Sequence, residues 1–382
     1  MYSVYQHWDP LKTCIVGKSY PPEFYSWIKN PTTRTIFERI AQETEEDFQS
    51  LIKLLKKFNV DVLRPDIPSD RELLFDTFNN TFVPPPMTPR DDFGMYGNTL
   101  IYSALTISDF YTNHKLDGLP EVFTYADAAE HIPKLGNDLN FNSDDFNILT
   151  PSTPNGDNAF YENIFTSVND DCNVIKLNNG ANTSTAFNVR IGKDIITAQS
   201  DACDNLNDLI NANNDYRIHN TNQFYHLDGV FCPVVPGLII SLNDIKDFNN
   251  TLPGWEVVYL HDQSWDKIKP FLDLKRKNKG KWWIPGEEYN DDVIDVVDTW
   301  LSKWVGYVEE TVFDVNMLVI DEKNVIVNNY NKVVFDALER YGVTPHICNF
   351  RHRYFWDGGL HCITTDLDRE GEIKDYFPQR NQ

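Results

Sequence analysis

The hydrophobic residues follow a helical period in four segments of the chain. Between residues 33 and 58 they recur every three or four positions around an acidic middle, which predicts a long amphipathic helix. Similar spacing predicts helices over 201–214, 291–304 and 331–342. The last of these ends at Gly342, a residue type favoured just past a helix end.

Shorter apolar runs, some alternating with polar residues, predict strands between these helices. They lie at 11–17, at 59–66, at 96–103, within 226–241 as two strands joined at Pro236-Gly237, and over 317–327 as a hairpin that turns at 321–324. Units of two or three strands and one helix thus repeat at irregular intervals, which predicts an α/β fold.

The segment 134–185 breaks this pattern because Asn, Asp, Ser, Thr and Gly dominate it. Such a composition predicts long loops, which either cover a site or form mobile surface. A chain of 382 residues is long enough for one large domain or two ordinary ones. No Pro/Ser-rich linker or charge run divides it, so we expect a single domain over residues 1–382.

The charge of the chain narrows the classes of partner. There are 34 Lys and Arg against 57 Asp and Glu, a formal net charge of −23, without a long basic run. Phosphate binding needs clustered positive charge, so no nucleic-acid partner is expected. An acidic field instead attracts small cationic ligands. Neither a G-x-G-x-x-G nor a G-x-x-x-x-G-K-[ST] loop is present, so no nucleotide or other cofactor is expected.

The six cysteines show no C-x-x-C pair and no regular spacing, so neither a disulfide framework nor a metal site is predicted. We expect reduced thiols in a cytoplasmic protein. The N-terminus lacks the basic start and the apolar run of a signal peptide. The most apolar long stretch, 230–242, is too short to cross a bilayer and contains two prolines, so no membrane partner is expected.

Two stretches carry candidate acids and an imidazole. Asp91 lies in TPRDDFGMYGN (88–98), which is predicted to be a loop. If FYHLDGVF (224–231) is a strand, His226 and Asp228 point to the same face, about 7 Å apart. The plain alternatives are a solvated loop aspartate and a polar pair on a wet strand face.

A third stretch, WDGGLHCITTDLDREG (356–371), places Cys362 behind Gly358 and Gly359. Free cysteine is often a core residue. Glycines, however, permit close approaches that other residues do not, and a lone cysteine with a histidine elsewhere is a candidate nucleophile. Its thiolate needs nearby positive charge, which a cationic substrate can supply. His361 would point to the opposite face of a strand, so it is not paired with the thiol.

In order along the chain, these stretches resemble the arginine:glycine amidinotransferase family of the pentein superfamily. The resemblance extends from about residue 5 to about residue 375, and it implies a five-bladed pseudosymmetric α/β propeller around a central site. The segments that carry it are WDPLKTCIVG (8–17), NVDVLRPD (59–66), MTPRDDFGMYGN (87–98), FYHLDGVFCPVVPGLIIS (224–241), MLVIDEKNVIV (317–327) and GGLHCITTDLDREG (358–371).

The resemblance also implies a chemistry without a cofactor or a metal. Cys362 matches the nucleophile that attacks the guanidinium carbon of arginine and keeps the amidino group while ornithine leaves. His226 matches the acid/base that protonates the leaving amine and deprotonates the incoming one. Asp228 and Asp91 match the carboxylates that hold the guanidinium. With glycine as the acceptor, the product would be guanidinoacetate.

Three positions depart from the family pattern. Where the family has the aspartate that orients the histidine, this chain has Ser184, and the nearest polar alternative is Asn188. An arginine for the substrate carboxylate is replaced by Ile245, and a serine pair by Glu309-Glu310. Acids disfavour a carboxylate nearby and favour an amine, so our hypothesis is that a diamine or another amine replaces glycine as the acceptor.

Two other functions stay open at this point. A hydrolase of the same superfamily, such as a deiminase or dihydrolase, would let water attack the intermediate. A non-catalytic binding protein on the same scaffold would agree with the missing acid near 184–188. The oligomeric state is also open, with a homodimer among the alternatives.

Overall fold

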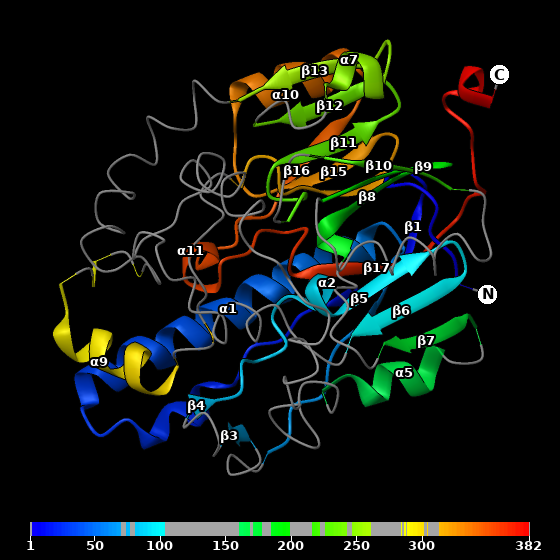
Figure 1. Cartoon of the computed structure of the whole chain (residues 1–382). Helices are drawn as coiled ribbons and strands as arrows, with labels where there is room; N and C mark the ends of the chain where they lie inside the picture. Colours follow the sequence, from blue (N-terminus) through cyan, green and yellow to red (C-terminus); the bar gives the residue numbers. More distant parts are fainter. Residues whose placement is uncertain are drawn as a thin grey trace, which may run out of the picture.

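The computed structural model describes residues 2–69, 74–76, 81–103, 160–168, 171–177, 185–198, 216–221, 226–242, 247–260, 284, 286–287, 289–301, 304 and 313–381. In this part of the chain, six small sheets and several helices pack together, with the long helix α1 (Pro31–Lys57) crossing the molecule (Figure 1). The fold is therefore α/β, as the pattern of apolar residues predicts.

Five of these sheets share one strand pattern. In each, the central strand pairs antiparallel with one neighbour and parallel with the other. They are β17 (Thr364–Arg369), β1 (Leu11–Val16) and β2 (Asp61–Leu63); β5 (Phe93–Tyr96), β6 (Thr99–Ser103) and β7 (Asn173–Leu177); β8 (Asn188–Ile191), β9 (Asp194–Thr197) and β10 (Arg217–Asn220); β11 (Phe231–Val235), β12 (Leu238–Ser241) and β13 (Glu256–Tyr259); and β14 (Leu318–Asp321), β15 (Asn324–Val327) and β16 (Thr344–Ile347). The sixth sheet contains only β3 (Phe75–Asp76) and β4 (Thr81–Phe82).

A strand near the start of the chain and a strand near its end pair in one of these sheets. Strand β1 pairs with β17 from Leu11 opposite Arg369 to Val16 opposite Thr364 (Figure 1). The nucleophile candidate Cys362 is two residues before β17, so the start of the chain supports the segment that carries it.

The antiparallel pair of each sheet is more deeply buried than the parallel third strand. Strands β8, β9, β11 and β12 are buried at every position, whereas β10, β13 and β16 are only partly covered. The buried strands are rich in Val and Ile, whereas β10 reads RIHN. A strand covered on both faces favours such continuous apolar runs.

Helix α1 begins and ends at residues that suit a helix. Asn30 caps it, because its Oδ1 accepts from the N–H groups of Thr32 and Thr33 at 3.0 and 3.4 Å, and Pro31 occupies the first position. The buried face of α1 packs into the first of three hydrophobic clusters of the described residues, and the second cluster surrounds β11, β12, β14 and β15. The other described helices are α2 (Pro89–Asp92), α5 (Glu162–Val168), α7 (Phe248–Thr251), α9 (Asp291–Trp300), α10 (Lys332–Arg340) and α11 (Arg353–Trp356), with 3-10 turns η1 (Pro22–Trp27), η5 (Thr185–Phe187) and η6 (Pro378–Asn381).

Most of the elements predicted from the pattern of apolar residues are confirmed. The structure contains the strands predicted at 11–17 and 59–66, the hairpin over 317–327 and the helices predicted over 33–58 and 331–342. The helix predicted over 291–304 ends earlier, and the strand pair within 226–241 is confirmed, with Gly237 at a φ of 97° in its turn. The helix predicted over 201–214 lies outside the described residues.

Four predictions are wrong in part. The segment 96–103 contains the end of β5, a turn and β6, rather than one strand. The segment predicted as loop over 134–185 contains α5 and β7, which pack onto the core through Ile164 and Val168 and onto β6. The loop predicted around Asp91 and the strand predicted around His226 also differ from the observed structure, as described with the site. Of the described helices, none is both long and apolar enough to cross a membrane.

Candidate active site

Cys362 lies in a turn, not in a strand. Residues 360–363, here called the nucleophile turn, connect the segment after α11 to β17. The N–H of Thr364 donates to the carbonyl of His361 at 3.1 Å, and its hydroxyl donates to the carbonyl of Leu360 at 2.8 Å. Because the turn does not alternate sides like a strand, His361 and Cys362 face the same partner, and the prediction that they point apart is wrong.

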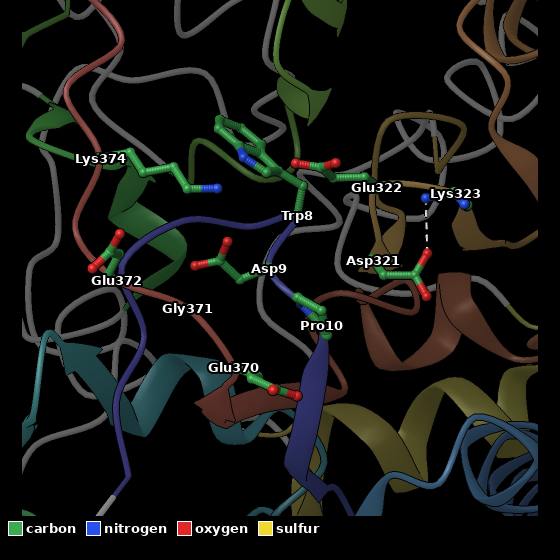
Figure 2. Close-up of a pocket in the computed structure, with 10 residues that line it drawn as sticks. All are labelled: Trp8, Asp9, Pro10, Asp321, Glu322, Lys323, Glu370, Gly371, Glu372 and Lys374. Carbon is green, nitrogen blue, oxygen red and sulfur yellow. Dashed lines mark hydrogen bonds between the residues drawn. The ribbon is translucent and has the colours of Figure 1, made fainter.

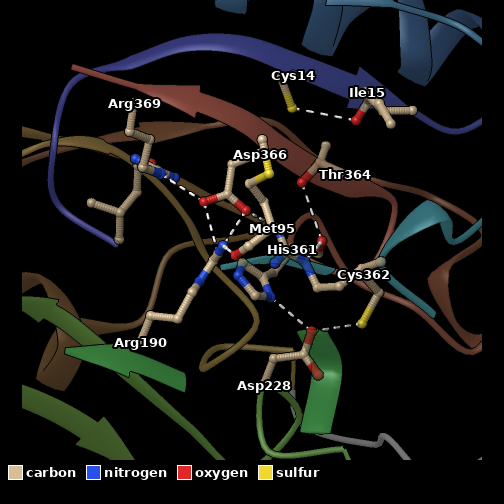
Figure 3. A network of polar contacts seen from close by, with 12 residues as sticks. Cys14, Ile15, Met95, Arg190, Asp228, His361, Cys362, Thr364, Asp366 and Arg369 are labelled. Atoms are coloured by element: carbon tan, nitrogen blue, oxygen red, sulfur yellow. Dashed lines mark hydrogen bonds and ion pairs between the residues drawn. The ribbon is translucent and has the colours of Figure 1, made fainter. Parts of the chain in front are cut away.

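That shared partner is the carboxylate of Asp228. Its Oδ2 accepts a hydrogen bond from His361 Nδ1 at 2.7 Å, and Cys362 Sγ donates to the same oxygen at 3.5 Å (Figure 3). Asp228 and Cys362 are 4% and 2% exposed, so these contacts lie in a buried site. The structure thus brings together two of the predicted site residues and adds His361.

Electrostatics keep His361 neutral and Asp228 ionised. Burial and the nearby Arg90 guanidinium lower the pKa of His361 to about 4, so its Nδ1 carries a single proton that it donates at neutral pH. Burial by itself raises the pKa of Asp228, but the hydrogen bond from His361 and the positive field of His226 and Arg90 bring it below its ordinary value. The sulfur therefore lies beside a carboxylate that is ionised at neutral pH.

His226 lies before a turn rather than in a strand, which corrects the prediction for 224–231. The carbonyl of Leu227 accepts from the N–H groups of Val230 and Phe231, both at 2.9 Å, and β11 begins only at Phe231. The His226 ring packs edge-on against Phe187, with the ring centroids 4.9 Å apart. The turn keeps His226 and Asp228 in one region, although the strand geometry that predicted their proximity is absent.

Asp91 lies in the helical turn α2, not in a loop, and its Oδ1 is 3.8 Å from Nδ1 of His226. Burial raises the pKa of Asp91, and the negative charge of Asp228 acts in the same direction, whereas His226 and Arg90 oppose them. Asp91 thus lies beside His226, and Asp228 is near enough for its charge to raise the pKa of Asp91. All four predicted site residues thus belong to one region.

Each of the two carboxylates has a buried oxygen that forms no hydrogen bond among the described residues. These atoms are Oδ1 of Asp228 and Oδ1 of Asp91, and the second of them lies 3.8 Å from Nδ1 of His226. Buried polar atoms normally have a partner, so such an atom calls for an explanation. Two oxygens of this kind in the region of Cys362 suit a ligand with several N–H donors.

The other described cysteines have thiols whose pKa is raised, which lowers the fraction of reactive thiolate. Burial raises the pKa of Cys14 and Cys232 to about 12, with Asp366 and Asp228 adding to the shift. It raises the pKa of Cys172 and Cys348 to about 11. All five described cysteines are free thiols.

Behind the nucleophile turn, one buried carboxylate holds three arginines. Asp366, on β17, accepts from Arg190 Nη2 at 2.9 Å with both oxygens and from Arg369 Nε at 2.7 Å (Figure 3). It also accepts from Arg90 Nη2 at 3.2 Å. Arg90 also donates from Nε to the carbonyl of His361 at 2.8 Å. The network therefore supports the turn. Sequence patterns did not predict it, because charged residues rarely occupy such an interior.

The positions that depart from the family pattern are mostly outside the described residues. These are Ser184, Ile245 and Glu309-Glu310. Asn188 is described: it is buried on β8, and its Nδ2 donates to the Tyr96 hydroxyl at 2.8 Å. It thus has a structural hydrogen bond that the sequence did not suggest.

A separate cavity of about 660 Å³ lies at another part of the molecule (Figure 2). Five carboxylates and two lysines line it beside Trp8 and Pro10, and none of the four predicted site residues does. Burial raises the pKa of Asp9, one of the lining acids, to about 6. No three His, Cys, Asp or Glu side chains of the described chain meet in a metal-binding group. The candidate active site is therefore defined by the contacts around Cys362.

We expect the free energy of unfolding to fall as the pH decreases from about 6.5 to about 4. In the unfolded chain His361 gains a proton near pH 6.5, whereas in the folded protein its pKa is about 4. The unfolded state therefore binds more protons in this window, at a cost of about 3 kcal/mol of stability. Denaturant titrations at pH 7, 5.5 and 4 measure the effect. His361→Gln should flatten the pH dependence, and an equal slope in both proteins would contradict this assignment.

Comparison with known proteins gives no match to a protein-family model. Among curated proteins, the chain is similar to an L-arginine:L-lysine amidinotransferase of Pseudomonas savastanoi pv. phaseolicola, 25% identical over 198 residues that cover 49% of this chain and 44% of that protein. It thus spans less than half the length of that relative. It is also similar to a mitochondrial glycine amidinotransferase of Gallus gallus, 24% identical over 98% of this chain and 84% of that protein.

The fold has a counterpart among solved structures. An amidinotransferase of the saxitoxin biosynthetic pathway from Microseira wollei matches with a TM-score of 0.61 and 18% identity, over 98% of this chain and 99% of that one. The chain therefore has the α/β fold of a solved amidinotransferase. Together with the sequence matches, this makes the protein a relative of the amidinotransferases, as the sequence motifs predict.

Proposed function

We propose that the protein is an amidinotransferase that moves an amidino group from a guanidino donor, L-arginine in the first instance, to an amine acceptor through a covalent intermediate on Cys362. The observation that carries the proposal is the position of the Cys362 sulfur, 3.5 Å from Asp228 Oδ2, in a site where Asp228 and Asp91 each have a buried oxygen without a hydrogen bond. The similar proteins described above are named amidinotransferases, which supports the same reaction.

The two carboxylates suit a guanidinium ligand. Guanidinium is a planar cation with five N–H donors, and carboxylates accept it through paired hydrogen bonds. A close ion pair contributes up to about 4 kcal/mol at an effective dielectric constant near 20, before desolvation is subtracted. Bound in this way, the substrate would also bring the positive charge that favours the Cys362 thiolate beside Asp228.

In the proposed reaction, the Cys362 thiolate attacks the guanidinium carbon, and the bond from that carbon to the side-chain nitrogen of arginine breaks. His226 gives a proton to the departing nitrogen, and ornithine leaves. The acceptor amine then attacks the amidino carbon, loses a proton to His226, and the carbon–sulfur bond breaks to restore the thiolate. A general acid/base of this kind contributes about 10²–10⁴-fold.

Asp91 supports the role of His226 in this scheme. The orienting aspartate of the family is replaced by Ser184 in the sequence. A carboxylate beside the imidazole stabilises the imidazolium and helps to hold its orientation. Asp91, with Oδ1 at 3.8 Å from His226 Nδ1, supplies such a carboxylate from the substrate side of the site.

A five-bladed pseudosymmetric propeller is the architecture that we propose for the whole chain as a single domain. The five sheets with one shared strand pattern, and the pairing of the first and last strands in one of them, support it. A cytoplasmic location stays a prediction from the sequence.

The function is tested by incubating the protein with arginine in the presence and absence of amines. Ornithine should form only when an acceptor is present, beyond one equivalent per protein. Because Ile245 and Glu309-Glu310 replace groups that would favour a carboxylate, we expect diamines or other amines to be better acceptors than glycine. Citrulline or ammonia from arginine without any acceptor would assign a hydrolase instead. Equal turnover with glycine and indifference to diamines would reject the acceptor hypothesis.

A further inference from the structure

The side chain of Asn316, two residues before β14, is fully buried against the nucleophile turn. Its Oδ1 accepts hydrogen bonds from the backbone N–H groups of His361 at 2.8 Å and of Cys362 at 3.2 Å. Its Nδ2 donates to Cys362 Sγ at 2.9 Å and to the carbonyl of Asp228 at 3.4 Å. One amide group therefore contacts both the backbone and the sulfur of the proposed nucleophile.

The chemistry of these partners determines how the amide is oriented. Backbone N–H groups only donate, so the atom that faces His361 and Cys362 must be the amide oxygen. The NH₂ group then faces the sulfur. The carbonyl of Asp228, which this group also approaches, can only accept. Two independent sets of partners thus require a donor toward the sulfur.

The sulfur lies between two groups that favour opposite protonation states. Oδ2 of Asp228, at 3.5 Å, can accept a proton from the thiol and repels a thiolate. The NH₂ group of Asn316 donates to sulfur and thereby stabilises the thiolate. We propose that Asn316 is a positioning residue that holds the nucleophile turn and stabilises the thiolate of Cys362. Its place in a catalytic cycle rests on the proposed function, whereas its effect on the thiolate does not.

The close contact with Asn316 also explains why the residue just before the turn, Gly359, has no side chain. A Cβ atom at Gly359 would lie 2.6 Å from Oδ1 and 2.8 Å from Cγ of Asn316, closer than real Cβ atoms come to other groups. The backbone before β14 is held by Asn328, whose Nδ2 donates to the main-chain carbonyls of Asn316 and Phe313, each at 3.0 Å. The side-chain amide of Asn316 is held by its own contacts with the nucleophile turn and Asp228.

The inference is tested by the pH dependence of alkylation of Cys362 by iodoacetamide, followed by mass spectrometry of the peptide that contains this residue. Asn316→Asp retains an oxygen for the two backbone N–H groups but places a negatively charged oxygen where the donor was. The midpoint of the alkylation profile should move to higher pH by roughly one unit or more, because a like charge disfavours the thiolate. Asn316→Ala, which loses the donor without adding a charge, should shift it less in the same direction.

Asn328→Ala is the control for a purely structural effect. It should lower the melting temperature through the loss of two hydrogen bonds and leave the alkylation midpoint unchanged, because Asn328 donates to backbone carbonyls and not to the sulfur. Midpoints equal to that of the wild type in folded Asn316→Asp and Asn316→Ala would overturn the inference. Shifted midpoints in the Asn316 variants, together with no amidino adduct on the wild-type protein, would keep the inference and reject the proposed function. An adduct on the wild-type protein together with unshifted midpoints in the variants would reject the inference and keep the proposed function.

Discussion

Replacement of Cys362 by alanine is expected to abolish both turnover and the covalent amidino adduct. Loss of the nucleophile in enzymes that use covalent catalysis lowers kcat by roughly 10⁴–10⁶-fold. The effect should be this large because in the proposed reaction the sulfur accepts the amidino group, and the other described thiols are poor substitutes. Burial raises the pKa of Cys232, the other thiol influenced by Asp228, to about 12.

Intact-mass spectrometry after incubation with arginine and other guanidino compounds measures the adduct directly. The wild-type protein should gain the mass of one amidino group, and Cys362→Ala should gain none. Cys348→Ala is a matched control, because Cys348 is also buried and free but is influenced by Asp47 of α1 rather than by Asp228. Cys348→Ala should form the adduct at the wild-type level. An adduct on Cys362→Ala would assign the chemistry to another residue. Binding of a guanidino compound without any adduct or turnover, in both proteins, would favour a non-catalytic binding protein.

Replacement of Asp366 by asparagine is expected to cause the largest loss of stability. The carboxylate is fully buried and contacts three arginines whose side chains are at most 1% exposed. Asparagine has nearly the same size but lacks the charge, so three buried guanidinium groups would lose their counterion. Removal of one partner from a buried ion pair costs about 3–5 kcal/mol, and here one change affects three pairs. Denaturant unfolding at pH 7 measures the change.

Asp368→Asn provides the comparison on the same strand. Asp368 is partly exposed and accepts one hydrogen bond from the N–H of Ser3 at 3.1 Å, so its replacement should cost about 1 kcal/mol or less. A loss of similar size for Asp366→Asn would contradict the interpretation of the buried network. Burial raises the pKa of Asp366, but the three arginines hold it well below its ordinary value. Its contribution to stability should therefore be present above about pH 4 and be lost only as the pH falls further.

Prediction from the sequence succeeded where a segment is long and its apolar period is regular. Helix α1 and the hairpin of β14 and β15 are of this kind, because local preferences and burial agree along the whole element. It failed for α5 and β7, which lie in a segment whose polar composition resembles that of loops. In these elements a few apolar residues, such as Ile164 and Val168, are buried on neighbouring strands and helices, and tertiary packing outweighs the local pattern.

The candidate site was predicted in its members but not in its geometry. The glycine pair before Cys362 and the H-x-D motif at His226 and Asp228 pointed to residues that the structure brings into one region, because reactive groups need backbone arrangements that leave a trace in sequence. The strand at 224–231 was wrong, and so was the separation of His361 from the thiol. Asp228 and His361 lie in turns, where the alternation of side chains along a strand does not apply.

The sequence by itself determined the helices and hairpins, the resemblance to amidinotransferases and the identity of the four proposed site residues. Only the tertiary structure decided that His361 and Asn316 contact the same site as Cys362, and that Asp366 joins three arginines behind it. The physical reason is that the period of apolar residues depends only on which face of a helix or strand is buried and which is exposed to solvent. A hydrogen bond between residues such as Asn316 and Cys362, 46 positions apart, depends on how distant elements pack, which no local pattern records.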